Sequence, residues 1–152
     1  DGQEGVSYLE LVEFIMKHGA KVEEDLHELW RRIVFSICIK NTDDHLRNHG
    51  FLLTENGWIL SPAYDINPVE HGNGLSLNIS EKSNELDLDL ALEVAEHFRL
   101  DKKDTGTIIE KIKKSVNNWQ EVSKKLGISK AEQERMAPAF EFSTGACRLK
   151  KK

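Results

Sequence analysis

The strongest constraint on the fold is a helical pattern that begins near Glu23 and becomes more apolar toward its end. Its apolar residues recur at the three- and four-residue spacing that places them on one face of an α-helix. They are Leu26, Leu29, Trp30, Ile33, Val34 and Ile37. The first turns are amphipathic and the last two are nearly all apolar, which is typical of a helix that enters the core before its chain continues as a loop. The sequence therefore predicts a buried helix that holds the following loop rigidly.

That loop, residues 41–48, reads NTDDHLRN and contains an aspartate and an asparagine five positions apart, Asp43 and Asn48. A second aspartate, Asp65, follows in the run AYDINP of residues 63–68. Protein kinases place a catalytic aspartate and a metal-binding asparagine at this offset, and a second metal-binding aspartate comes after a strand pair. The spacing therefore predicts the catalytic half of a phosphotransferase site.

The residue types have a chemical reason. Phosphoryl transfer needs a carboxylate that orients the attacking hydroxyl, and oxygen ligands that hold Mg²⁺ against the phosphates. Asp43 fits the first role, whereas Asn48 and Asp65 fit the second because Mg²⁺ accepts amide and carboxylate oxygens. Asp44 is the alternative to Asp43, but it lies only four residues before Asn48. The spacing favours Asp43, and we expect Asp44 to be a solvated loop carboxylate.

A β-hairpin is predicted between the two halves of this motif. Residues 50–54 (GFLLT) and 58–61 (WILS) flank the turn sequence Glu55-Asn56-Gly57. An Asn-Gly pair between such runs is a strong hairpin signal. The hairpin would carry the chain out and back, so that Asp65 returns beside Asn48.

These residues resemble the C-terminal portion of the HipA-like family of serine/threonine kinases, the toxins of bacterial toxin–antitoxin modules. The resemblance is dense over about residues 26–67 and rests on NTDDHLRN, on GFLL (50–53), on Gly57-Trp58 and on LSPAYDI (60–66). It implies that Asp43 is the catalytic aspartate and that Asn48 and Asp65 are metal ligands. It also implies that His45 and Tyr64 lie against the nucleotide. A structural histidine that hydrogen-bonds the loop is an equal alternative for His45.

The resemblance further implies ATP and Mg²⁺ as cofactors and transfer of the γ-phosphoryl group to a protein serine or threonine. Aminoacyl-tRNA synthetases are among the family's substrates, and a small helix-turn-helix antitoxin is the implied partner. Kinases hold ATP with a glycine-rich loop and a strand lysine, and nothing before Asp43 supplies either. We therefore expect the intact protein to be a kinase and this fragment alone to be inactive.

Three other interpretations stay open. The chain could be a non-catalytic helical interaction module that retains the motif, or part of a small-molecule kinase of the aminoglycoside or choline type. Asp and Asn are also common in loops for purely structural reasons. A zinc site at His45 and His49 is disfavoured, because Leu46 stands where a zinc-protease motif has glutamate.

The whole-chain features favour one domain of 152 residues, mainly α with a small β-hairpin, forming a partial protein-kinase-like C-terminal lobe. No apolar run is long enough to span a membrane, and two isolated cysteines suit the cytoplasm. The net charge of −5 argues against direct nucleic-acid binding. The basic tail, residues 145–152, is expected to be flexible.

The remaining pattern is helical, apart from residues 75–79 (LSLNI), whose alternation predicts a short strand. Ser7 and Glu10 predict a capping box for a helix that ends at Gly19. The helical remainder spans residues 86–138 and contains three predicted helices. One carries the stripe Leu90, Ala91, Val94, Ala95 and Phe98; the next runs from Asp101 or Asp104 to Gly127 with Ile108, Ile109, Ile112, Val116, Trp119 and Val122 inward; the last starts at Ser129 with Glu132 and stops before Pro138.

Overall fold

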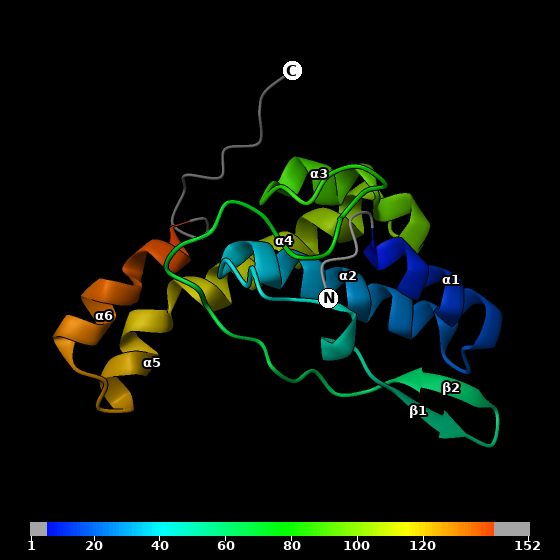
Figure 1. The fold of residues 1–152 in the computed structure, drawn as a ribbon, viewed down its shortest axis with the longest axis horizontal. Coiled ribbons are helices and arrows are strands. Elements are labelled where there is room, and N and C mark those ends of the chain that lie inside the picture. The colour runs from blue at the N-terminus through cyan, green and yellow to red at the C-terminus, as the bar shows by residue number, and fades with distance from the viewer. Residues whose placement is uncertain (1–5, 142–152) are drawn as a thin grey trace.

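Helix α2 (Val22–Cys38) runs through the middle of the protein in the computed structural model, which describes residues 6–141 (Figure 1). It contacts α1, α3, α4, β2 and the short 3₁₀ helix η2. All six residues of its predicted apolar face are fully buried. Burying a large apolar side chain contributes about 1.5–3 kcal/mol, so this face organises the core as the sequence pattern predicts.

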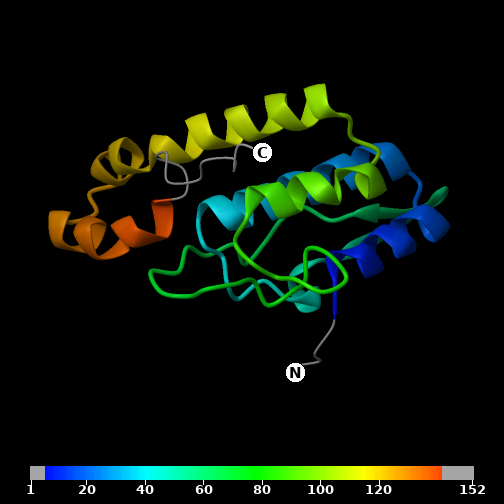
Figure 2. The ribbon, with the colours of Figure 1, turned by 90° about the horizontal axis from the view of Figure 1, so that it is seen from above.

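The described residues are mainly helical with one two-stranded antiparallel hairpin, which confirms the predicted fold class. Figure 2 shows α4 along one side of α2 and the irregular segment of residues 61–86 on the other. The elements in chain order are α1 (Tyr8–His18), α2 (Val22–Cys38), η1 (Leu46–Asn48), β1 (Phe51–Thr54), β2 (Gly57–Leu60), α3 (Leu88–Glu93), η2 (Ala95–Phe98), α4 (Lys102–Asn117), α5 (Trp119–Lys125), α6 (Lys130–Met136) and η3 (Ala137–Phe140).

The helix starts follow the predicted capping chemistry. Ser7 begins α1 with a complete capping box, in which its hydroxyl and the Glu10 carboxylate satisfy backbone N–H groups that the helix leaves free. Ser129 does the same with Glu132 for α6. Asp101 caps α4 by accepting two backbone N–H groups at 2.8 Å, which selects it over Asp104 as the start of that helix.

The hairpin is fastened to the helices beside it. Its register pairs Phe51 with Leu60 and Thr54 with Gly57. The N–H of Leu60 donates to the buried Asp25 carboxylate of α2 at 2.9 Å. Gly57 has φ +125°, and a Cβ there would lie 2.8 Å from the His18 carbonyl oxygen. Only glycine therefore suits this position, where the turn packs against the end of α1.

The short strand predicted at residues 75–79 is not formed. The burial alternates as expected, with Leu75, Leu77 and Ile79 buried and Ser76 exposed. However, the backbone groups bond to separate partners: Leu75 N to Asn84 O, Asn78 N to Val6 O, and Ile79 N to Ser83 O. A strand needs one continuous ladder, so the segment contributes only isolated bridges.

Two predicted helices are shorter than expected. Ala91, Val94, Ala95 and Phe98 of the predicted stripe are buried and Leu90 is partly buried, but the last turn tightens into η2, as helix ends often do. The next helix breaks at Asn118, after Asn117, because asparagine side chains compete for backbone hydrogen bonds and favour helix ends. The break turns Val122 outward. Its side chain is exposed, so the prediction that it faces inward is wrong. Trp119 stacks on Phe140 at 4.4 Å between ring centroids.

Cys38 is fully buried in α2, as expected for a small hydrophobe. Cys147 and the basic tail of residues 145–152 lie outside the described residues. Within residues 6–141, no helix combines the length and the apolar character that crossing a membrane requires.

Two leucines provide a matched test of the core. Leu29 in α2 is fully buried, whereas Leu126 is 73% exposed. We predict that Leu29→Ala lowers the free energy of unfolding by about 2–5 kcal/mol, because it removes buried methyl groups and leaves a cavity. Leu126→Ala should change it by less than about 0.5 kcal/mol. Urea denaturation measures both, and equal effects would contradict the assignment of α2 as the core helix.

Candidate active site

The loop of residues 41–48 is anchored directly to the end of α2. Lys40 adopts a left-handed conformation with φ +50°, which turns the chain out of the helix. The N–H of Asn41 then bonds back to the Ser36 carbonyl at 2.9 Å, and the Asn41 side chain is buried. The loop therefore begins at a position that the core helix determines.

A second segment, residues 67–76, lies against this loop. The N–H of Val69 donates to the Lys40 carbonyl at 3.2 Å, and the Ser76 hydroxyl donates to the Thr42 carbonyl at 2.7 Å. Gly72 has φ +145°, and a Cβ there would lie 2.6 Å from the Thr42 side chain. Close packing on the loop therefore explains the glycine at this position.

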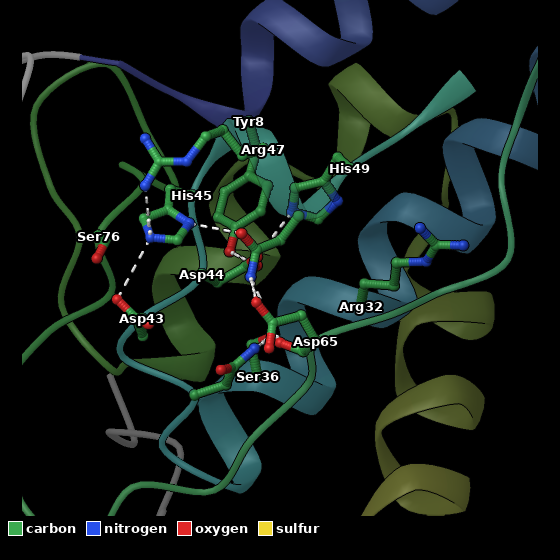
Figure 3. Close-up of polar contacts among 12 residues, drawn as sticks. Tyr8, Arg32, Ser36, Asp43, Asp44, His45, Arg47, His49, Asp65 and Ser76 are labelled. Atoms are coloured by element: carbon green, nitrogen blue, oxygen red, sulfur yellow. Dashed lines mark hydrogen bonds and ion pairs between the residues drawn. The ribbon is translucent and has the colours of Figure 1, made fainter. Parts of the chain in front are cut away.

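The predicted catalytic and metal-binding residues form a continuous chain of polar contacts. His45 Nε2 lies 3.4 Å from Asp43 Oδ1, and His45 Nδ1 donates to Asn48 Oδ1 at 2.5 Å. The Asn48 amide N–H then donates to Asp65 Oδ2 at 3.0 Å. Figure 3 draws these contacts between the loop and the segment after the hairpin. The hairpin thus returns Asp65 beside Asn48, the juxtaposition expected from the sequence.

Asp65 is exposed and is held in an uncommon backbone conformation. Its φ of +54° lies in the left-handed region, which costs a non-glycine residue about 1–2 kcal/mol. Both carboxylate oxygens are bonded, Oδ2 to Asn48 and Oδ1 to the Asn67 amide at 2.8 Å. Asn48 and Asp65 are therefore adjacent and carry an amide oxygen and a carboxylate, the ligand types that Mg²⁺ accepts. The amide nitrogen faces Asp65 and the amide oxygen faces His45. The residues present fit the predicted cation.

The two residues predicted to lie against the nucleotide occupy the same region. The His45 side chain is 30% exposed and contacts both Asp43 and Asn48. It therefore hydrogen-bonds the loop, as the structural alternative for this residue requires. Tyr64 is 46% exposed, and its hydroxyl donates to the Arg47 carbonyl at 2.8 Å. Tyr64 thereby ties the segment before Asp65 to the loop. Nucleotide contact by these two residues stays a prediction.

Asp44 differs from its expectation as a solvated loop carboxylate. It is 3% exposed, and both of its oxygens accept hydrogen bonds. The Tyr8 hydroxyl donates to Oδ2 at 2.5 Å, and His49 Nε2 donates to Oδ1 at 2.9 Å (Figure 3). The neighbouring Asp43 is the solvated carboxylate, with 78% of its side chain exposed. The sequence could not show this, because Tyr8 lies 36 positions away.

The same contacts act on Tyr8. Its ring is fully buried, and burial together with the negative charge of Asp44 raises the pKa of the Tyr8 phenol well above its ordinary value. Tyr8 therefore stays protonated and remains a hydrogen-bond donor to Asp44 at physiological pH.

The zinc interpretation is not supported by the two histidines. His45 Nδ1 faces Asn48, whereas His49 Nε2 is buried against Asp44, so each ring is engaged with its own partner. In the part of the chain that the structure describes, no three His, Cys, Asp or Glu side chains gather as a metal-binding group.

Several residues that shape the site were not found from the sequence. Asn67 and Asn41 are the clearest examples. The side-chain amide of Asn67 donates to Asp65, and the backbone N–H of Asn67 donates to the Asn41 side-chain oxygen at 3.4 Å. The position of Asn67 two residues after Asp65, in the same AYDINP run, was an available signal. An apolar groove of about 950 Å³ between α3, η2 and α4 has none of the five predicted site residues in its lining.

Comparison with known proteins identifies the family. Residues 2–120 match the model of the HipA-like C-terminal domain. The chain belongs to this family. The match includes α1, the hairpin and all five predicted site residues, and it ends near the start of α5.

A relative of the HipA-like chain occurs in Haemophilus influenzae (strain ATCC 51907 / DSM 11121 / KW20 / Rd), where it is named "Putative kinase". The two sequences are 35% identical over 66 residues. The alignment covers 43% of this chain and only 19% of the relative.

The raised pKa of Tyr8 predicts how stability depends on pH. The folded state keeps the phenol proton above pH about 10, where the unfolded chain loses it. The folded state then binds more protons than the unfolded state, so stability falls as pH rises above about 10. We predict that Tyr8→Phe removes part of this decline, as measured by urea unfolding between pH about 8 and 11.

A second measurement follows the ionisation of Tyr8 directly, by tyrosinate absorbance in a Tyr64→Phe variant. Tyr8 and Tyr64 are the two tyrosines of the chain. In that variant the tyrosinate absorbance reports Tyr8 alone. An unchanged pH slope after Tyr8→Phe, or ready ionisation of Tyr8 in the folded state, would show that the phenol is not buried against Asp44.

Proposed function

We propose that the protein is an ATP-dependent protein serine/threonine kinase of which this chain supplies the base and the metal ligands. Membership of the HipA-like family and the name of the relative support a kinase-like protein. The observation that carries the proposal is the unbroken polar contact from Asp43 through His45 and Asn48 to Asp65. This chain of contacts links residues of the types that, in kinases, orient the attacking hydroxyl and hold the cation.

In this proposal Asp43 receives the attacking hydroxyl of the substrate. Its side chain is exposed, so a protein serine or threonine can reach it. His45 holds Asn48 Oδ1 and lies beside Asp43, which keeps the base and the metal ligand at a constant separation. Such fixed positioning supplies much of the catalysis in phosphoryl transfer.

Asn48 and Asp65 would hold Mg²⁺ through their side-chain oxygens. The bound cation would neutralise charge on the phosphates. Asn67 and Asn48 orient the Asp65 carboxylate by donating to its two oxygens. His45 and Tyr64 would face the nucleotide, where Tyr64 fastens the Asp65 segment to the loop through the Arg47 carbonyl.

The wider role proposed for the intact protein follows the family. It would act in the cytoplasm as the toxin of a bacterial toxin–antitoxin module, with a helix-turn-helix antitoxin as partner. Its substrate would be a protein, with an aminoacyl-tRNA synthetase as the candidate to test first.

Asp43→Asn in the intact protein tests the proposal. The amide cannot accept the substrate proton, so we predict a loss of phosphotransfer of about 10²–10⁴-fold, because a general base contributes that much. Transfer of labelled γ-phosphate to protein measures the effect. The control is Asp104→Asn, which makes the same chemical change at an exposed residue of α4.

The proposal fails if Asp43→Asn retains full activity. Toxicity that persists in this variant would instead favour a non-catalytic interaction module. Transfer to an aminoglycoside or choline and not to protein would favour the small-molecule kinase alternative.

A further inference from the structure

A buried carboxylate next to Asp43 connects three separate parts of the chain. Asp44 accepts hydrogen bonds from Tyr8, the first residue of α1, and from His49, which leads into the hairpin. The rings of Tyr8 and His49 also pack edge to face, with centroids 5.7 Å apart. All three side chains are buried. This Tyr8–Asp44–His49 cluster is separate from the polar chain that runs from Asp43 to Asp65.

Asp43 depends on such an anchor because its own side chain is mostly exposed. The position of an exposed side chain follows from its backbone, and here the backbone is held on both sides. Asn41 is fixed to α2, and Asp44 N donates to the Asn41 carbonyl at 3.3 Å. The Asp44 side chain then fixes the end of this turn to α1.

We propose that Asp44 is a positioning residue for phosphotransfer, which holds Asp43 in place through the buried hydrogen bonds to Tyr8 and His49. This inference rests on the proposed kinase function. The two adjacent carboxylates then have different roles because their environments differ. Asp44 is buried and hydrogen-bonded within the protein, whereas Asp43 is exposed and available to substrate. In the sequence, the spacing from Asn48 and the family resemblance distinguish the two aspartates, and the structure adds their difference in burial.

A carboxylate suits the anchor because it has two acceptor oxygens for two buried donors. Removing it would leave the Tyr8 hydroxyl and the His49 N–H without an acceptor, and a buried unsatisfied group is costly. Asparagine has the same shape. Its Oδ1 can accept from Tyr8, and its amide N–H can donate to His49 Nε2 if the ring proton moves to Nδ1, which has no hydrogen-bond partner among the described residues.

The test compares four variants of the intact protein in a phosphotransfer assay. Asp44→Ala and Tyr8→Phe should lower kcat, the former by about tenfold to a hundredfold, because small misplacements of catalytic groups cost that much. The KM for ATP should stay unchanged. Asp44→Asn should retain most of the kcat, whereas Asp43→Asn should abolish it. This pattern distinguishes a positioning residue from the base itself.

Asp101→Ala is the control for stability. It removes the N-cap of α4 and should lower the unfolding free energy by about 0.5–2 kcal/mol without touching the loop. If it lowers kcat as much as Asp44→Ala does at equal loss of stability, Asp44 is merely structural. If Asp44→Asn abolishes activity while Tyr8→Phe has no effect, Asp44 is itself the base. Either result overturns the inference.

Hydrogen exchange in this chain provides a readout that does not need catalysis. Asp44→Ala should speed amide exchange in residues 41–48 by about tenfold or more while α4 is unchanged, because the loop loses its tie to α1. Unchanged exchange in the loop would overturn the positioning role. If the intact wild-type protein transfers no phosphate but the loop exchange responds as expected, the kinase proposal fails and the anchor stands.

Discussion

The burial of α2 is the interaction on which the rest of the structure depends. Its apolar face is fully buried, and the helix contacts α1, α3, α4, η2 and β2. Because the helix cannot slide or rotate without exposing that face, its last turn has one position. The loop begins there, where Asn41 bonds back to the helix. The close packing of the core around α2 therefore fixes the position of Asp43, although Asp43 itself lies outside the core. Catalytic groups need such rigid support.

Buried polar groups of α2 decide where the chain returns after the hairpin. Asp25 accepts the Leu60 N–H at 2.9 Å, and Arg32 donates to the Ser61 carbonyl at 2.6 Å. A buried charge is tolerated only when it is bonded, so these two side chains hold the end of β2 in a single register. From Ser61 the chain reaches Asp65 within four residues. The separation of Asp65 from Asn48 is therefore set by two charges on the core helix.

The sequence predicted the features that depend on local pattern. The apolar face of α2, the Asn-Gly hairpin and the capping boxes at Ser7 and Ser129 each have a signal within a few residues, and the structure confirms them. What it could not predict depends on contacts between distant segments. The strand at 75–79 failed because its partners are scattered, and Asp44 was misjudged because Tyr8 covers it.

The burial of Asp44 also explains how two adjacent carboxylates can differ in chemistry. In an isolated loop Asp43 and Asp44 would both be solvated, and spacing alone would separate them. Folding places α1 over one of them, so that a protonated phenol and an imidazole take up both of its oxygens. Asp44 is only 3% exposed, so a substrate hydroxyl cannot reach it, whereas the Asp43 side chain is 78% exposed. Under the proposed function, the burial of Asp44 therefore favours Asp43 as the base, and this argument does not depend on the five-residue spacing.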